Sequence, residues 1–238
     1  MTSSTLRRIE GLDWQAAARA LDTEGFATFP AILRRAACRQ LRDKFDDDQT
    51  HFRSTIDMAR YNFGRGRYRY FGYPLPDEVE HLREAFYPPL ARIANGWAER
   101  LGQTPIWPHT LGDLMERCHA GGQVRPTPLL LHYGAGDYNC LHQDLYGPIH
   151  FPLQVIVMLS DPATEFRGGE LVLVEQRPRM QSRPMVVPLE LGAAAVIPVR
   201  ERPRQGTRGW HRVQMRHGVS RVLSGSRTTL GLIFHDAL

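Results

Sequence analysis

Three side chains of this sequence have the types and the spacing to hold one metal ion. His142 and Asp144 are separated by one residue, and on a β-strand residues i and i+2 project from the same face. About 75 residues later the chain has His217. Two histidines and one carboxylate that leave coordination positions open suit non-haem Fe(II). The pattern therefore predicts an Fe(II) site with room for O₂ and a bidentate oxo acid.

A cationic side chain follows His217 at a distance that suits the far carboxylate of such an oxo acid. Arg227 presents a planar fork of five donors, which matches a carboxylate. Thr229 lies on the same face of the predicted last strand and could add a hydroxyl. Tyr133, upstream of the metal-binding pair, could donate its phenol to the same cosubstrate.

His211 is an alternative third ligand. Arg221 lies ten residues beyond it, just as Arg227 lies ten residues beyond His217. His132, His150 and His235 flank the site region and are expected to be hydrogen-bonded structural histidines.

The second half of the chain predicts the β-strands that must position these side chains. From about residue 126, short runs rich in Val, Ile and Leu alternate with Gly and Pro breaks. The predicted strands cover residues 128–133, 151–159, 169–174, 185–189, 193–199, 219–223 and 228–234. Short strands separated by turns in this way are typical of a sandwich or barrel.

The first half predicts helices. Apolar residues recur at helical spacing, and the predicted helices cover about 14–21, 33–45, 77–102 and 111–118. Pro88 and Pro89 are expected to kink or split the third helix, because proline removes an internal donor and clashes one turn back.

The fold class that follows is α+β, mainly β: a double-stranded β-helix of the jelly-roll or cupin-like type, with N-terminal helices packed on it. No repeat or low-complexity linker separates the halves. We expect one domain over residues 1–238. Residues of about 1–125 would form a helical support and a possible substrate lid, and about 126–238 the catalytic core.

Composition narrows the class of protein. The chain has 238 residues, 42% hydrophobic and 23% charged, which excludes disorder, collagen-like repeats and coiled coils. No apolar run approaches the roughly 18 residues needed to span a bilayer, and the first residues lack the apolar stretch of a secretory signal. Three cysteines with no metal-binding spacing suggest a reducing interior. We expect a cytoplasmic protein that does not bind membranes.

Basic residues are concentrated in two segments of a chain whose formal net charge is +5. Residues 60–73 hold four arginines and no acid, and residues 200–221 hold seven arginines and one acid. Such patches fit a polyanionic partner such as nucleic acid. Solvated loops are the alternative interpretation.

The first basic segment alternates arginines with tyrosines. If it is extended, Arg65, Arg67 and Arg69 share one face, and Tyr68 and Tyr70 share the other. One interpretation is a half-buried hairpin with its aromatic side chains inward. The other is a substrate-binding lid, with arginines on phosphates and a tyrosine stacked on a base that has left its helix.

The order of the metal-binding and oxo-acid residues resembles the Fe(II)- and 2-oxoglutarate-dependent dioxygenase superfamily. Its pattern is H-x-D, a later histidine, and a basic residue about ten positions beyond. His142, Asp144, His217 and Arg227 match it in this order, and Gly225 and Thr229 complete the match only when His217 is the third ligand.

Two branches of the superfamily are similar in part. The stretch 166–171, FRGGEL, is similar to a strand of the prolyl hydroxylases, and so is the spacing of Arg227. The stretch 133–144 looks like the approach to the iron in AlkB-type enzymes that repair alkylated bases, although Leu131 stands where those carry asparagine.

A small bacterial oxygenase family assigned to oxidative dealkylation of damaged DNA resembles essentially the whole chain. The similar segments are 65–71, 118–120, 141–147, 176–179 and 234–237. The resemblance implies an enzyme that uses Fe(II), 2-oxoglutarate and O₂ to dealkylate bases in DNA, hence DNA repair. Two alternatives stay open: a prolyl, other amino-acid or small-molecule hydroxylase, and a non-catalytic jelly roll that binds a metal or ligand.

Overall fold

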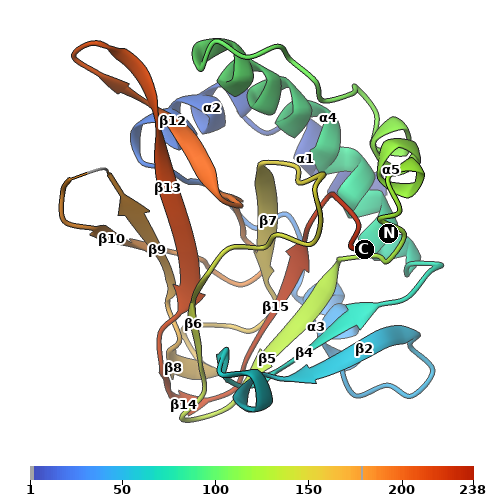
Figure 1. Cartoon of the computed structure of the whole chain (residues 1–238). Helices are drawn as coiled ribbons and strands as arrows, with labels where there is room; N and C mark the ends of the chain where they lie inside the picture. The colour runs from blue at the N-terminus through green and yellow to red at the C-terminus, as the bar shows by residue number, and fades with distance from the viewer. Residues whose placement is uncertain (1–2, 178) are drawn as a thin grey trace.

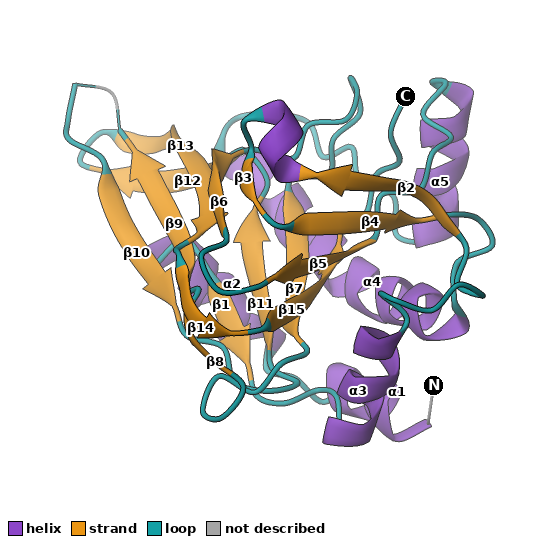
Figure 2. Cartoon of the chain, turned by 90° about the horizontal axis from the view of Figure 1, so that it is seen from below, coloured by secondary structure: helices purple, strands orange, loops and turns teal. Residues whose placement is uncertain are grey.

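Two antiparallel β-sheets face each other, and helices cover the outer face of the larger one (Figures 1 and 2). The computed structural model describes residues 3–177 and 179–238. Pro178 belongs to one of the segments that carry the family resemblance and lies outside the described residues. Residues 1 and 2, the start of the segment predicted not to be a secretory signal, also lie outside them. The predicted fold class, a mainly β jelly-roll core with helices packed on it, is confirmed.

The helices of the described residues all lie in the first half of the chain. They are α1 (Ser3–Glu10), α2 (Trp14–Thr23), α3 (Arg35–Asp43), the 3₁₀ helix η1 (Met58–Tyr61), α4 (Asp77–Arg100) and α5 (Leu111–Ala120). Pro88 and Pro89 lie inside α4 without splitting it. Phe86 and Leu90, on either side of them, are buried in the core, and this packing offsets the missing backbone donors.

Strands are found in both halves of the chain. The first half contains β1 (Ala27–Phe29), β2 (Phe52–Asp57), β3 (Gly64–Arg65) and β4 (Arg67–Phe71). The second half contains β5 (Leu129–Tyr133), β6 (Tyr138–His142), β7 (Leu153–Met158), β8 (Phe166–Gly168), β9 (Leu171–Gln176), β10 (Arg183–Val187), β11 (Ala194–Pro198), β12 (Glu201–Gly206), β13 (Gly209–Val219), β14 (Val222–Gly225) and β15 (Arg227–Leu232).

The strand order corrects the predicted division into a helical half and a β half. The larger sheet has the order β1-β11-β7-β15-β5-β4-β2, and the smaller one β10-β9-β13-β6-β3, with β12 paired to β13. Strands of the first half therefore extend both sheets. They cover edges that would otherwise leave backbone donors and acceptors unpaired.

The larger sheet is buried on both faces. Val155 and Val157 of β7 pack in the core on the helical side. The alternate residues Ile156 and Met158 face the smaller sheet. Alternation along β15 likewise places Leu230 among the helices. The space between the two sheets is therefore the interior of the jelly roll, and every second residue of its strands points into it.

The long β12–β13 hairpin was not among the predicted strands, because its sequence is rich in arginine. Arg202 of β12 is fully buried, and its guanidinium lies 2.5 Å from Glu175 of β9. Arg204 contacts the same carboxylate at 2.7 Å, and Arg212 pairs with Glu201 at 3.1 Å. Part of the second basic segment thus serves the fold.

No helix within the described ranges is long and apolar enough to cross a membrane.

Candidate active site

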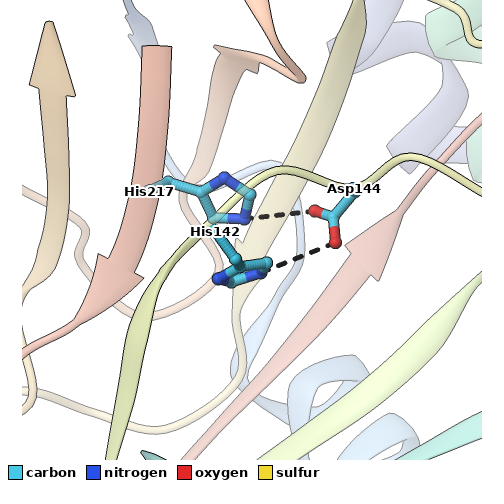
Figure 3. Close-up of side chains that lie close together, drawn as sticks. All are labelled: His142, Asp144 and His217. Atoms are coloured by element: carbon cyan, nitrogen blue, oxygen red, sulfur yellow. Dashed lines mark ion pairs between the residues drawn. The ribbon is translucent and has the colours of Figure 1, made fainter. Parts of the chain in front are cut away.

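His142, Asp144 and His217 meet between the two sheets (Figure 3). His142 is the last residue of β6 and lies directly opposite His217 of the neighbouring β13. Asp144 Oδ2 lies 3.1 Å from His217 Nε2, and Asp144 Oδ1 lies 3.5 Å from His142 Nε2. One ligand atom from each residue falls within 4.8 Å of the others, which is compact enough for a single metal ion.

The expectation that Asp144 shares a strand with His142 is wrong, because β6 ends at His142. Asp144 lies in the loop that follows, and the residue between them holds that loop in place. Gln143 Nε2 donates to the carbonyl oxygens of Met215 at 2.8 Å and Arg200 at 3.1 Å. These bonds turn the loop back over β13, so the carboxylate points at both imidazoles.

Gly218 allows the two ligand strands to approach so closely. A Cβ atom at this position would lie 2.6 Å from the carbonyl oxygen of Asn139 on β6. The β6–β13 pairing also shifts register between His217 and Val219. The glycine that directly follows the third ligand is therefore needed for strand contact at an irregular point of the ladder.

Two phenols form a hydrogen-bonded chain that ends at Asp144. Tyr146 donates to Asp144 Oδ1 at 2.8 Å, and Tyr70 donates to the Tyr146 oxygen at 2.9 Å. Burial by itself would raise the pKa of Asp144, but the two imidazoles hold it well below its ordinary value. An ionised carboxylate only accepts hydrogen bonds, so Tyr146 must be the donor.

The donor set fits a first-row divalent metal ion. His142 Nδ1 lies 2.8 Å from the carbonyl oxygen of Cys140 and donates to it, which leaves the Nε2 lone pair directed at Asp144. A backbone acceptor that fixes the tautomer in this way is typical of metal-binding histidines. His217 Nδ1 is buried and has no hydrogen-bond partner among the described residues. Burial lowers the pKa of His217, so its imidazole is available as a neutral ligand.

A cavity of about 330 Å³ extends from these three residues to Arg227 at the start of β15. Arg227 is 1% exposed, and its Nε and Nη1 atoms have no hydrogen-bond partner within the described residues. Burial lowers the pKa of its guanidinium to about 10, so the side chain is a cation at neutral pH. A buried cation without an anion beside it is costly, and the carboxylate of an oxo acid would supply that anion.

The other predicted oxo-acid residues lie beside Arg227. Tyr133 of β5 is its direct cross-strand neighbour, with the guanidinium 5.5 Å from the centre of the ring. Thr229 lies two residues along β15 and also lines the cavity, as the shared strand face predicts. Arg227, Tyr133 and Thr229 therefore form one end of the cavity, and the three candidate metal ligands lie further along it.

Gly169 explains why the FRGGEL stretch precedes this site. It adopts a left-handed conformation, with φ of 65°, and a Cβ atom there would lie 3.0 Å from Arg227 Cδ. The glycine thus leaves the space that the arginine side chain occupies.

The alternating segment 65–70 is split between the interior and the surface. Tyr68 and Tyr70 line the cavity, whereas none of the three arginines does. Arg69 donates to the carbonyl oxygen of Phe45 and to the Thr55 hydroxyl, outside the cavity. The tyrosines are thus candidate substrate contacts, and Arg67 and Arg69 contribute to the outer face of β4.

His217 and not His211 completes the metal-binding cluster. His211 is exposed in the β12–β13 hairpin, opposite Arg204. His132 contacts the Thr228 hydroxyl at 3.1 Å, and the buried His235 accepts from the amide of Phe151 at 3.1 Å. Both are structural, as expected.

Tyr146 and Gln154, two cavity residues whose side chains contact the candidate metal ligands, were not predicted from the sequence. Tyr146 follows Asp144 by two positions in an irregular loop, so no periodicity marks it. Gln154 Nε2 lies 3.4 Å from His217 Nε2. Gln154 could have been found from the sequence, because it is the one polar residue in the apolar strand LQVIVM. In the structure it is 2% exposed.

Comparison with known proteins connects this site to a chemistry. Residues 66–237 match the model of a family described as "Oxygenase, catalysing oxidative methylation of damaged DNA". An uncharacterized protein of Mycobacterium tuberculosis, found in strains CDC 1551 and H37Rv, is 50% identical over 167 residues. That match covers 70% of this chain and 72% of the relative.

Solved structures share the fold. A Trichoplax adhaerens prolyl hydroxylase in complex with a peptide of hypoxia inducible factor is 15% identical with a TM-score of 0.58, over 99% of this chain and 94% of that one. An oxidoreductase of the 2OG-Fe(II) oxygenase family from Burkholderia pseudomallei is 14% identical with a TM-score of 0.54, over 95% and 94% of the two chains.

Proposed function

We propose, since the chain belongs to the oxygenase family described as acting on damaged DNA, that it is an Fe(II)- and 2-oxoglutarate-dependent dioxygenase that removes alkyl groups from DNA bases. The observation that carries the proposal is the pairing of two features in one cavity. Two histidines and a carboxylate meet at one place. At another place lies a buried guanidinium that has no anionic partner among the residues the structure describes.

His142, Asp144 and His217 would hold the metal, and Arg227 would pair with the distal carboxylate of 2-oxoglutarate. Tyr133 and Thr229 would contact the same cosubstrate. The bound Fe(II) would activate O₂ as 2-oxoglutarate is decarboxylated to succinate, with one oxygen atom going into a substrate C–H bond and the other into succinate. Arg227 would neutralise and orient the cosubstrate, which the two sheets would enclose.

The oxidative chemistry favours removal of a methyl group over its addition. Insertion of oxygen into an N-methyl C–H bond gives N–CH₂OH. Loss of that N–C bond, with transfer of the hydroxyl proton to the base nitrogen, releases formaldehyde and the unmodified base. Addition of a methyl group would require a methyl donor and no O₂. We therefore take oxidative dealkylation as the reaction.

The cavity limits how a base could be reached. Tyr68, Tyr70 and Tyr146 line it from one side, and the metal ligands lie between the two sheets. A stacked base in a duplex cannot enter such a space, so the target nucleotide has to be extruded or single-stranded. The three tyrosine rings would contact the faces or edges of the extruded base.

The test is a substrate panel with the purified protein, Fe(II), 2-oxoglutarate and O₂. We expect succinate and stoichiometric formaldehyde with an N-methylated oligonucleotide, and loss of both with Asp144→Ala. An unmodified oligonucleotide and a proline-containing peptide serve as controls. Succinate with the peptide alone would assign the amino-acid hydroxylase alternative, and no succinate with any substrate would favour the non-catalytic one.

A further inference from the structure

The cavity opens at the surface between the segment η1–β3 and strand β6. Four of the residues that line it are also exposed: Asn62, Phe63, Cys140 and Leu141. Figure 2 shows β3 and the short helix beside it next to β6. A substrate that reaches the metal ligands from solvent therefore passes these side chains.

Exposed aromatic rings gather at this opening. Four tyrosine or phenylalanine side chains are exposed among the described residues, and three of them belong to η1, the turn after it, and β6: Tyr61, Phe63 and Tyr138. Tyr61 and Phe63 are 55% and 47% exposed and are stacked, with ring centres 5.5 Å apart and planes at 21°. Large exposed aromatic surface at one place marks an interaction site.

Backbone hydrogen bonds hold the turn that carries Tyr61 and Phe63. Met58 is fully buried, and its carbonyl oxygen accepts the amide of Phe63 at 3.1 Å. The Phe63 carbonyl in turn accepts the amide of Cys140 on β6 at 2.8 Å. Asn62 adopts a left-handed conformation, with φ of 58°, which closes the turn between the two rings. The backbone that carries the two rings is thus fixed, which reduces the ordering required when a ligand binds.

Basic side chains flank the stacked rings. Arg60 has 80% of its side chain exposed, and its closest ion-pair contact, Asp57, lies at 3.9 Å. Arg65 pairs with Tyr138 through the backbone of β3, but its exposed side chain makes no hydrogen bond or ion pair within the described part of the chain. The order along the chain is therefore cation, ring, ring, cation, at residues 60, 61, 63 and 65.

We propose that Tyr61 and Phe63 form a stacking platform for a base of single-stranded nucleic acid next to the extruded target, with Arg60 and Arg65 on the flanking phosphates. The proposal rests on the proposed function and names its contact surface. Flat parallel rings suit the faces of bases, and the flanking cations suit a polyanion. The platform adds to the substrate contacts predicted for this segment, because Tyr68 and Tyr70 line the cavity and Arg65 flanks the stacked rings.

The test measures binding of a fluorescein-labelled single-stranded oligodeoxynucleotide by fluorescence anisotropy with the full-length protein. We expect Tyr61→Ala/Phe63→Ala to raise Kd about tenfold or more. Tyr61→Phe/Phe63→Tyr keeps both rings and should retain wild-type affinity. Val186→Ala and Leu223→Ala are matched controls, because these side chains are 59% and 65% exposed on other strands. Both should bind as the wild type does.

Two further measurements separate stacking from a general loss of structure. A 2-aminopurine next to the methylated base should lose fluorescence on binding to the wild type and to the Phe/Tyr exchange, but not to the double alanine variant. Arg65→Gln should reduce the slope of log Kd against log salt by about one counterion. Thermal unfolding of each variant confirms that it is folded.

Failure of this proposal is distinguishable from failure of the proposed function. If the wild type demethylates the oligonucleotide and the double alanine variant binds it equally well, the platform is wrong and the enzyme assignment stands. If the wild type binds no oligonucleotide and oxidises a peptide, both are wrong.

Discussion

Replacing Tyr146 by Phe removes one oxygen atom next to the candidate metal site and leaves the aromatic ring in place. Its hydroxyl donates to Asp144 Oδ1 at 2.8 Å, while Asp144 Oδ2 faces His217 at 3.1 Å. The phenol thus occupies one carboxylate oxygen and leaves the other for a metal ion. Without it, the carboxylate is free to turn, and Oδ1 loses its donor.

The expected magnitude follows from the type of bond. A hydrogen bond to an ionised group contributes about 1.5–3 kcal/mol, and Asp144 is only 7% exposed, so water replaces the phenol poorly. We therefore expect Tyr146→Phe to weaken metal binding by about 10- to 100-fold, the range found when partners of metal ligands are removed. Tyr70→Phe, which removes only the outer bond of the chain, should have a smaller effect.

The assay is calorimetric titration of the metal-free protein with Co(II), combined with the visible absorption of the Co(II) complex. Tyr73→Phe is the matched control, because Tyr73 donates to the buried Asp236 at the same distance, 2.8 Å, away from the metal ligands. It should lower stability but leave the Co(II) affinity unchanged. An unchanged affinity in Tyr146→Phe, or an equal loss in Tyr73→Phe, would show that the Tyr146 hydroxyl does not position Asp144 for the metal ion.

Three further predictions concern the oxo-acid end and the fold. Arg227→Met should raise the KM for 2-oxoglutarate at least about 30-fold, because a buried charged pair contributes about 2 kcal/mol or more; an unchanged KM in the succinate assay contradicts the assignment. Gly169→Ala should also raise that KM, because the new Cβ would lie 2.9 Å from Val222 Cγ2 and 3.0 Å from Arg227 Cδ and would displace Arg227. Gly102→Ala, at a similar φ of 68° and with no atom of the described residues within 4 Å, should affect stability only. Glu175→Gln should lower the free energy of unfolding by about 3 kcal/mol at pH 7 in urea, because it leaves the buried Arg202 unpaired. Burial favours a higher pKa for Glu175, but its arginine partners hold it below 4.5. The difference in the free energy of unfolding between the wild type and Glu175→Gln should therefore be full above pH 4.5 and decline as the pH falls further. A difference independent of pH would count against this explanation.

Much of the site was predictable, because its chemistry depends on residue types at short spacing. The one-residue separation of His142 and Asp144, and the ten-residue separation of His217 and Arg227, are local properties of the chain. Apolar runs bounded by breakers, such as 153–158, were predictable as strands for the same reason. Strands β6 and most of β13, which carry His142 and His217, were not among the predicted strands. The four predicted helices were confirmed as α2 to α5, but α1 and η1 were not predicted. The strands β1 to β4 form only because the sheets of the second half offer them an edge.

Two imidazoles, a carboxylate and a guanidinium follow one another along the chain in an order that suits a metal ion and an oxo acid, and this order is readable without coordinates. Which of these groups come into contact depends on how the strands pair. The pairing of β6 with β13 placed His217 opposite His142 and left His211 in a distant hairpin. The folded chain also brings the Tyr146 hydroxyl to Asp144 and exposes Tyr61 and Phe63 at the opening. The physical reason is that pairing between strands far apart in the chain, and the burial that results, set the neighbours of each side chain, and neither is encoded in local spacing.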